Sequence, residues 1–348
     1  DCPLPQVLCA DTEEALGELA AGVQQGRPAV VVALTGSNGK TSVKTLVHSI
    51  LSQAGKACAN PGNRNNEIGL PLSVLEAPED ARFAIYEMGA GKPGDIAYLA
   101  SIAPPQVALV NNIGPAHLER MGSLLGIAET KGAIYEALPD DGVAVVNADD
   151  AFAPLFMQRI GGRRVLRFGL ENDADIRASG LRLGAEASEF TLHTPAGDAR
   201  VRLPLPGRHS VMNALAAAGL ALGAGARLEH VVAGLEAAPP VPGRQVPHAL
   251  RNGVVLVDDS YNANPGSVAA AIAALAETGG EAWLVLGDMH ELGPDAGALH
   301  AEAGRQALRA GIKRLWTVGP MSAGASRAFG AGARHFDDQA GLLAALGP

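Results

Sequence analysis

The stretch ALTGSNGKTSVKTLVHSIL, residues Ala33–Leu51, indicates how the chain around it folds. The overlapping run Ala29–Leu34 is short, apolar and rich in β-branched residues, as is typical of a buried parallel strand. A helical pattern then extends from about Lys40 to Ala54. Between the two, Gly36 and Gly39 enclose two small polar residues. A strand, a glycine-rich turn and a helix in this order predict a phosphate-binding loop.

The side chains of this turn have the chemistry that a nucleoside triphosphate requires. Glycines let backbone N–H groups turn toward phosphate oxygens, and the helix N-terminus adds a favourable dipole. Lys40 is placed to reach the β- and γ-phosphates, and Thr41 is placed to ligate Mg²⁺. Leu34 stands where the full GxxxxGK[ST] pattern has its first glycine, so a glycine-rich turn without a ligand is the alternative. We expect ATP phosphates to contact Gly36, Ser37, Asn38, Gly39, Lys40, Thr41 and Ser42.

Length and composition limit the classes of protein that the chain can belong to. Its 348 residues suffice for two domains and part of a third, and its 47% of hydrophobic residues allows large cores. A formal net charge of −9 argues against binding of nucleic acid. The three cysteines have neither metal-like spacing nor the density of a disulfide framework, which favours a reducing cytoplasm. No apolar stretch reaches membrane length, so we expect no membrane insertion.

Strand-like and helical segments alternate through the first two thirds of the chain. After the first strand, apolar runs follow at Phe83–Met88, Val107–Asn111, Val143–Asn147 and Val165–Phe168. This alternation predicts a doubly wound α/β sheet around the phosphate-binding loop. The segment Ile176–Leu205 breaks the pattern with short strands separated by turns, which predicts a small antiparallel insert.

The prolines of Ala237–Gln245 mark the clearest domain boundary, because they cannot continue the preceding helix. Beyond it the alternation resumes, which predicts a second, Rossmann-like open sheet. Its expected elements are strands at Val254–Val257, Ala282–Leu286 and Leu315–Val318, a helix from about Pro265 and a helix through His300. We therefore divide the chain into a linker at 1–27, a central ATP-binding domain at 28–240 and a C-terminal α/β domain at 241–348.

Polar residues follow two of the predicted strands beside the loop. Glu87 ends one strand, while Asn111, Asn112 and His117 follow the next. Ligands of such sheets gather at the carboxyl ends of the strands, so Glu87 and His117 are candidates to complete a magnesium shell with Thr41. Taken singly, Glu87 would read as a solvated carboxylate and His117 as a packing residue. The position of both residues beside the loop favours a role in binding a metal ion. Lys131, taken alone, would be interpreted as a surface lysine.

Six segments, in this order, resemble the Mur ligase family. They are TGSNGKTSVK, NNEIGLPLSVL, NIGPAHLERMGSLLGIAETK, LPLPGRHSVMNALAAAGLAL, DDSYNANPGSVAAAI and VLGDMHELG, and the resemblance extends from about Ala10 to Ala310. Ser210 stands where the family usually has asparagine, and Ala133 where glutamate often follows Lys-Gly. The last two segments point to the member that adds D-alanyl-D-alanine to UDP-N-acetylmuramoyl-tripeptide.

The resemblance implies an ATP-dependent ligase that forms an amide bond through an acyl phosphate, using ATP and two Mg²⁺ ions. It implies that Lys40 neutralises phosphate charge and that Thr41, Glu87 and His117 handle magnesium. Lys131 matches a lysine that is carbamylated by CO₂ in the family, which would let it support the second Mg²⁺. The implied catalytic residues are Lys40, His117 and Lys131. The partners are UDP-N-acetylmuramoyl-tripeptide and D-alanyl-D-alanine, and we expect a monomer.

Further nucleotide contacts come from the same resemblance. Asn213 matches the asparagine on the adenine side, and Arg244 matches an arginine that domain closure brings onto the nucleotide. The cleft between the domains would be lined by Asp259, Tyr261, Asn262 and Asn264. For these four residues a turn-stabilising role is an equal alternative, since Asx residues before a proline also favour turns.

The resemblance also implies segments beyond this chain, and two other functions stay open. The family has an N-terminal UDP-binding domain, of which residues 1–27 would be the end, and a final Lys-Gly-Ser-Arg segment that the C-terminal domain here would stop short of. One alternative is a related ligase such as a folylpolyglutamate synthase. Another is an ATP-binding fragment without catalytic activity.

Overall fold

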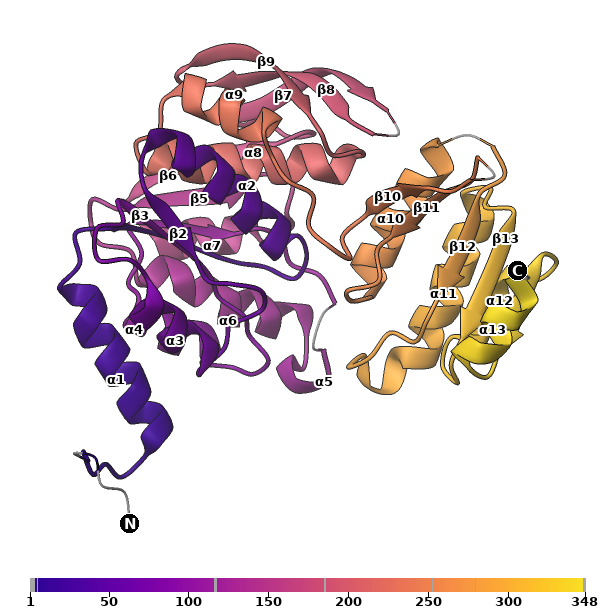
Figure 1. Ribbon diagram of the computed structural model, residues 1–348, viewed down its shortest axis with the longest axis horizontal. Coiled ribbons are helices and arrows are strands. Elements are labelled where there is room, and N and C mark those ends of the chain that lie inside the picture. The colour runs from indigo at the N-terminus through magenta and orange to yellow at the C-terminus, as the bar shows by residue number, and fades with distance from the viewer. Residues whose placement is uncertain are drawn as a thin grey trace.

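The computed structural model describes residue 4 and residues 6–115, 118–184, 186–251, 253–278 and 280–346. A large α/β unit carries the phosphate-binding loop, and a smaller unit beyond residue 240, orange to yellow in Figure 1, faces it. Within the described ranges, no helix combines the length and the hydrophobicity needed to cross a lipid bilayer.

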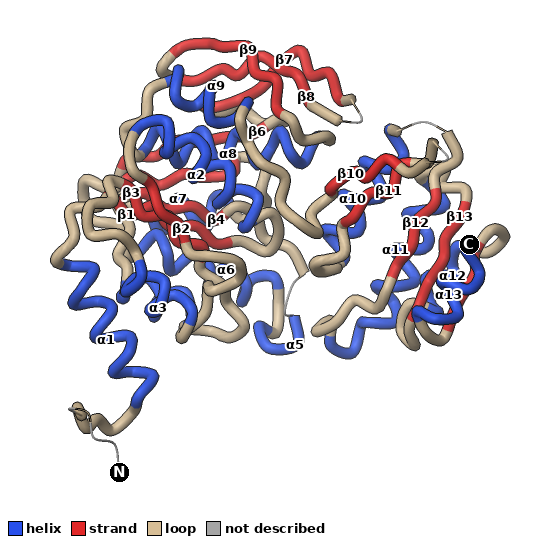
Figure 2. Tube along the Cα trace, in the orientation of Figure 1, coloured by secondary structure: helices blue, strands red, loops and turns tan. Residues whose placement is uncertain are grey.

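In the described residues, nine strands form one sheet in the large unit, with the order β2-β3-β1-β4-β5-β6-β7-β8-β9. Neighbours from β2 to β7 are parallel, and β8 and β9 continue the sheet as antiparallel strands (red in Figure 2). The strands are β1 (Val30–Thr35), β2 (Ala57–Ala59), β3 (Phe83–Glu87), β4 (Val107–Val110), β5 (Val143–Asn147), β6 (Arg164–Gly169), β7 (Ile176–Leu183), β8 (Ser188–Thr194) and β9 (Gly197–Leu203).

Helices cover both faces of this sheet, because successive side chains of β1 point to opposite sides and both sides are apolar. Val32 and Leu34 belong to the core beneath α2 (Lys40–Ala54), α8 (Arg208–Gly223) and α9 (Leu228–Glu236). Val31 and Ala33 belong to the core on the other face. The helices there are α1 (Thr12–Gln25), α3 (Gly69–Glu76), α4 (Asp95–Ile102), α6 (Leu124–Glu136) and α7 (Ala153–Ile160), and the short α5 (Leu118–Met121) precedes α6.

The smaller unit has two separate sheets in its described residues. Strands β10 (Val246–Ala249) and β11 (Val255–Asp258) form an antiparallel pair, while β12 (Trp283–Leu286), β13 (Arg314–Val318) and β14 (Ala333–Phe336) are parallel. The helices are α10 (Pro265–Glu277), the 3₁₀ turn η1 (Gly293–Asp295), α11 (Ala296–Arg309), α12 (Ala323–Phe329) and α13 (Gln339–Leu346). Buried side chains of α10, α11, α12, β12 and β13 share one core.

The expected fold class is confirmed: a doubly wound sheet carries an antiparallel extension, and a parallel α/β unit follows it. The placement of Val254–Val257 in the second open sheet is wrong, because β11 pairs with β10 and has no partner in the parallel sheet among the described residues. A tight connection explains this difference. Leu250 N donates to Val254 O at 2.8 Å, and Gly253 has a φ angle of 79°, so the chain reverses at once and pairs locally.

Candidate active site

The predicted phosphate-binding loop connects β1 to α2. Gly36 and Gly39 have φ angles of 151° and 76°, a region that favours glycine. A Cβ atom on Gly39 would lie 2.6 Å from Oδ1 of Asn213, so close approach of the backbone also requires glycine there. Gly39 is the N-cap of α2, and no side chain of the described residues caps this helix end. The first N–H groups of α2 are therefore available to an anion.

The loop is held in shape by residues that follow β4. Ser37 N donates to Asn112 O at 2.9 Å, and Asn38 N donates to Asn112 Oδ1 at 2.8 Å. Asn111 Nδ2 donates to Asn38 O at 2.9 Å, and Gly114 N donates to Ser37 Oγ at 2.9 Å. These bonds cross between neighbouring strands of the sheet, so contacts within the protein hold the loop in this conformation.

Lys40 lies against this loop. Its Nζ donates to Gly36 O at 2.8 Å, which gives the ammonium a backbone partner in the ligand-free protein. Surrounding protein lowers the pKa of the Lys40 ammonium, Glu87 opposes this shift, and the charge of Arg244 adds to it. Lys40 is thus within electrostatic reach of both units of the molecule, as a group that neutralises phosphate charge needs to be.

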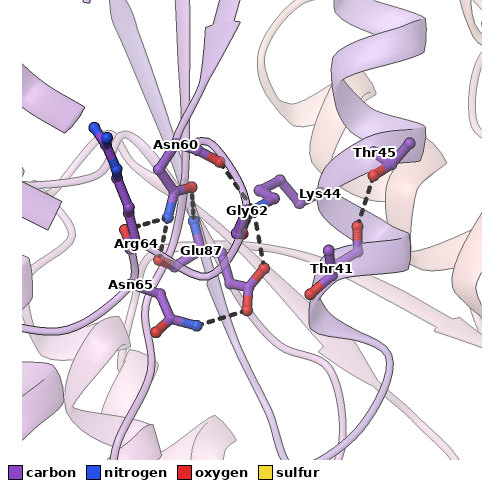
Figure 3. Close-up of polar contacts among 8 residues, drawn as sticks. All are labelled: Thr41, Lys44, Thr45, Asn60, Gly62, Arg64, Asn65 and Glu87. Atoms are coloured by element: carbon purple, nitrogen blue, oxygen red, sulfur yellow. Dashed lines mark hydrogen bonds and ion pairs between the residues drawn. The ribbon is translucent and has the colours of Figure 1, made fainter. Parts of the chain in front are cut away.

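Glu87 ends β3 and is 2% exposed (Figure 3). Its Oε1 accepts a hydrogen bond from Asn65 Nδ2 at 2.8 Å, and its Oε2 lies 3.2 Å from Nζ of Lys44. Among the described residues, Oε2 is buried without a hydrogen-bond partner of good geometry. A carboxylate oxygen with spare acceptor capacity at the wall of a polar pocket suits a divalent cation.

The residues present therefore fit the expected magnesium site. Glu87 and Thr41 border the same pocket. No cluster of three or more His, Cys, Asp or Glu side chains in the described part of the chain could hold a metal by itself, so phosphate oxygens would have to supply further ligands. His117, the third predicted ligand, lies outside the described residues.

Lys131 lies on α6 and is 2% exposed, which excludes a role as a surface lysine. Burial lowers the pKa of its amine well below the usual value, the charge of Lys40 adds to this effect, and Asp95 opposes it. No hydrogen bond or ion pair of the Lys131 amine is found within the described residues. Burial of an amine near the loop lysine costs free energy, and within the described residues no ion pair offsets this cost.

Residues after the domain boundary face the loop from the smaller unit. The guanidinium of Arg244 lies 4.1 Å from the ring centroid of Tyr261, a cation–π contact. Asn264 is the N-cap of α10, and its Nδ2 donates to Asn38 Oδ1 at 2.6 Å. A side chain of the smaller unit thus contacts the phosphate-binding loop directly.

One pocket of about 460 Å³ brings most of the predicted residues together. Its lining includes Ser37, Asn38, Gly39, Lys40, Thr41, Glu87, Arg244, Tyr261, Asn262 and Asn264. The pocket is polar, and it has the phosphate-binding loop on one side and the start of α10 on the other. Both units of the molecule therefore contribute to a single site.

Five predicted residues are not among the described residues that line this pocket: Gly36, Ser42, Lys131, Asn213 and Asp259. Asn213 lies directly behind the loop, where its Oδ1 accepts from Asn111 Nδ2 at 3.3 Å. Asp259 lies close to Gln245, whose Nε2 is 3.5 Å from Asp259 Oδ2. Burial raises the pKa of the Asp259 carboxyl group.

The pocket also contains residues to which sequence reasoning gave no role. They are Asn63, Asn65, Asn66, Glu67, Gly89, Ala90, Gly91, Lys92, Asp95, Tyr98, Leu99, Arg120 and Ser267. Several belong to or adjoin the NNEIGLPLSVL segment, which was noted for its resemblance alone. The resemblance of that segment to the Mur ligases could have indicated that its residues line this wall of the pocket. Lys44, which contacts Glu87, was also missed, although it lies one helical turn after Lys40.

A P-loop on a doubly wound sheet and a second α/β unit line the same polar pocket, an arrangement suited to an enzyme that uses a nucleotide, and comparisons with known proteins identify its class. The Mur ligase middle domain matches residues 34–221, and the glutamate ligase domain of the Mur ligases matches residues 243–346. The chain belongs to the Mur ligase family.

Particular relatives narrow this class. The chain is 46% identical over 347 residues to the UDP-N-acetylmuramoyl-tripeptide–D-alanyl-D-alanine ligase of Escherichia coli (strain K12), covering 99% of this chain and 76% of that protein. A crystal structure of MurF from Acinetobacter baumannii matches with a TM-score of 0.95 and 36% identity, over 99% of this chain and 76% of that one. MurF ligase from Thermotoga maritima in complex with ADP matches with a TM-score of 0.88 and 28% identity, over 98% and 78%.

Proposed function

We propose that this chain joins the terminal carboxylate of UDP-N-acetylmuramoyl-tripeptide to the amine of D-alanyl-D-alanine and converts ATP to ADP and phosphate. The reaction is a step in the synthesis of peptidoglycan precursors. The observation that carries this proposal is the single polar pocket shared by the phosphate-binding loop, Glu87 and Arg244. The chain that forms it is 46% identical to the UDP-N-acetylmuramoyl-tripeptide–D-alanyl-D-alanine ligase of E. coli.

ATP is needed because a free carboxylate is a poor acyl donor, whose leaving group would be oxide. Transfer of the γ-phosphoryl group gives an acyl phosphate, which releases phosphate readily when the amine attacks. Catalysis then consists mainly of positioning and charge neutralisation. Lys40 and the N–H groups at the start of α2 are placed to offset charge on the phosphates.

We assign the magnesium ions to Thr41, Glu87, His117 and Lys131. Bound Mg²⁺ would neutralise phosphate charge and orient the phosphoryl group. Glu87 supports this assignment through Oε2, which among the described residues is buried without a hydrogen bond of good geometry, and Thr41 through its position at the start of α2 on the wall of the same pocket.

We also propose that Lys131 is carbamylated. Reaction with CO₂ needs the neutral amine, and burial lowers the pKa of Lys131 so that this form is accessible. The carbamate would convert a buried cation into an anion, which lowers the repulsion from Lys40 and provides oxygen ligands for a metal ion.

We assign the remaining nucleotide contacts to residues that lie in or near the pocket. Asn213 is assigned to the adenine side, and Arg244, Asp259 and Asn262 to the nucleotide face of the smaller unit. We keep the division into a central ATP-binding domain at 28–240 and a C-terminal domain at 241–348.

We place the reaction in the cytoplasm. Cys9 and Cys58, which both lie in the described residues, are free thiols, and this supports a reducing compartment. We also propose that the chain acts as a monomer.

A coupled assay of ADP release tests the function. D-alanyl-D-alanine and UDP-N-acetylmuramoyl-tripeptide together should support turnover, with an amide product detected by mass spectrometry. Turnover with folate and glutamate instead would identify a folylpolyglutamate synthase. Nucleotide binding without any amide product would identify an ATP-binding module.

A further inference from the structure

Lys44 has no role in the chemistry above, yet it is a buried cation next to the site. It lies on α2, one turn after Lys40, and is 5% exposed. Glu87 borders the pocket, whereas Lys44 is not among the described residues that do so. Any effect of Lys44 on the site therefore passes through other residues and not through contact with a ligand.

The Lys44 ammonium makes two hydrogen bonds and one ion pair with its surroundings (Figure 3). Nζ donates to Asn60 O at 2.9 Å and to Gly62 O at 2.8 Å, and it lies 3.2 Å from Oε2 of Glu87. Two of these partners are backbone carbonyls of one segment, which we call the 60–65 loop. A single ammonium thus connects α2, the 60–65 loop and the end of β3.

The same loop holds Glu87 from the other side. Asn65 Nδ2 donates to Oε1 of Glu87 at 2.8 Å. Asn60 Oδ1 accepts from Glu87 N at 2.9 Å, and Asn60 Nδ2 donates to Arg64 O at 2.8 Å. Lys44 and Asn65 therefore contact one carboxylate oxygen each, and Asn60 fixes the backbone that carries it (Figure 3).

We propose that Lys44 is a positioning residue for magnesium–nucleotide binding: it clamps the 60–65 loop to α2 and holds the Glu87 carboxylate in the orientation that a metal ion requires. This inference rests on the proposed function, because it takes Glu87 as a magnesium ligand. The proposal also assigns a role to the NNEIGLPLSVL segment, because Asn65 at its start supplies the second contact to the Glu87 carboxylate.

Two effects of removing Lys44 oppose each other. Loss of a cation beside Glu87 would by itself favour binding of another cation there. However, it would also leave two carbonyls of the 60–65 loop without their donor and a buried carboxylate without its counter-ion. The loop can relieve both costs only by moving, and Asn65 would then leave Oε1. The geometry of the ligand would be lost, so the net effect is weaker binding of magnesium.

Calorimetry of ADP binding, in EDTA and in excess Mg²⁺, separates positioning from general damage to the fold. Lys44→Met keeps the aliphatic stem and removes the charge and the donors. Its matched control is Lys56→Met, which removes a lysine from an ion pair with Asp80 in which the Lys56 side chain is 52% exposed. Lys44→Arg keeps the charge and several donors.

Lys44→Met should bind ADP in EDTA as the unmodified chain does, because the phosphate-binding loop has its own bonds to Asn112. In Mg²⁺ its affinity for ADP should fall about 10-fold, the usual cost of losing a residue that supports a metal ligand. Lys44→Arg should recover part of this loss, and Lys56→Met should show none. In a Glu87→Gln background, Lys44→Met should cause no further loss, because its effect passes through the carboxylate.

Three outcomes would overturn the proposal. Unchanged or tighter Mg²⁺–ADP binding in Lys44→Met would mean that Lys44 does not position the ligand. An equal loss of affinity for ADP in EDTA and in Mg²⁺ would mean that Lys44 has a structural role only. If Lys44→Met lowers the affinity for ADP just as much in the Glu87→Gln background, the effect of Lys44 does not pass through the Glu87 carboxylate. If Lys44→Met does not fold, Lys44→Gln carries the same expectations. If the unmodified chain binds ADP equally well with and without Mg²⁺, it is the proposed function that fails.

Discussion

The side chain of Asn264 performs two tasks at once. Its Oδ1 accepts from Ser267 N at 3.0 Å, which caps α10, and its Nδ2 donates to Asn38 Oδ1 at 2.6 Å. Asn38 belongs to the phosphate-binding loop, whose backbone is bonded to Asn112 and Asn111. The start of α10 is thereby attached to the part of the site that would hold phosphates. We therefore expect nucleotide binding at this loop to depend on the position of the smaller unit.

Substitutions at Asn264 can separate the two tasks. Asn264→Ser keeps an N-cap oxygen but cannot reach Asn38, so its thermal midpoint should fall less than that of Asn264→Ala. Loss of the hydrogen bond to Asn38, worth roughly 1 kcal/mol, should raise the KM for ATP about fivefold. Asn264→Ala should also lower the thermal midpoint, since a lost cap costs about 1 kcal/mol. Thermal unfolding and steady-state kinetics measure the two effects.

Asn264→Asp is the control for this separation. Aspartate also caps a helix, but it has no proton for Asn38 Oδ1 and brings a negative charge toward the loop. Its KM for ATP should rise more than that of Asn264→Ser while α10 stays intact. A normal KM in both variants would show that the Asn38 contact does not matter for nucleotide binding.

Lys40→Ala should lower ATP turnover by about 100-fold or more, because a charge that stabilises the phosphoryl group is removed. The fold should persist, since the hydrogen bonds of Nζ go to carbonyls of the loop itself. The coupled assay and the thermal midpoint check the two statements, and Lys56→Ala is the exposed control. Near-normal turnover would remove the assignment of the phosphate-binding loop.

The phosphate-binding loop was predictable because its signals are local. A β-branched run, two glycines and a helix pattern are neighbours in the sequence, and the predicted helix coincides with α2 at Lys40–Ala54. The doubly wound sheet was predictable for a similar reason, since each buried strand is a short apolar run. Strand β2, with three residues, is too short to give such a signal.

Other features depend on contacts between distant residues and were not predictable. Lys44 meets Glu87 across 43 positions, and Asn264 meets Asn38 across 226. Nothing near Lys131 in the sequence shows that its amine is buried; that follows from the packing of α6 against the sheet. The hairpin of β10 and β11 did have a local signal, the Asn-Gly dipeptide at 252–253, which the alternating pattern masked.

Lys131→Ala should be nearly inactive if the carbamate supports a metal ion. A short carboxylic acid added in solution should restore part of the activity by filling the vacated space, and Lys131→Arg should stay inactive because it is a cation. Burial lowers the pKa of Lys131 well below its usual value, which favours the neutral amine that reacts with CO₂. Activity should therefore fall when bicarbonate is removed at mildly acidic pH and return when it is added back.

Labelled bicarbonate gives a direct readout of this modification. With ¹³C-bicarbonate at mildly alkaline pH, the unmodified chain should show a carbamate carbonyl signal that Lys131→Ala lacks. Absence of that signal in a magnesium- and nucleotide-bound sample would contradict carbamylation. Loss of the signal in acid would not, since carbamates decompose there.

The lowered pKa of His209, the second residue of α8, leads us to expect that the stability of the fold depends on pH. Burial lowers its pKa from 6.5 to about 4, so the folded protein holds the neutral ring. Below pH 6.5 the His209 ring is protonated in the unfolded chain but stays neutral in the folded chain. The free energy of unfolding therefore decreases as pH falls from 6.5 toward 4.

The size of this loss is measurable by urea unfolding. Between about pH 7 and pH 4.5, protonation linked to His209 should cost about 2 kcal/mol of unfolding free energy, from 1.36 kcal/mol per pKa unit. His209→Gln removes the titrating group, so its unfolding free energy should fall less over the same interval, although its stability at neutral pH is lower. Carboxyl groups also titrate in this range, but they are common to both proteins and cancel in the comparison. Equal pH dependence of the two proteins would show that His209 titrates normally in the folded state.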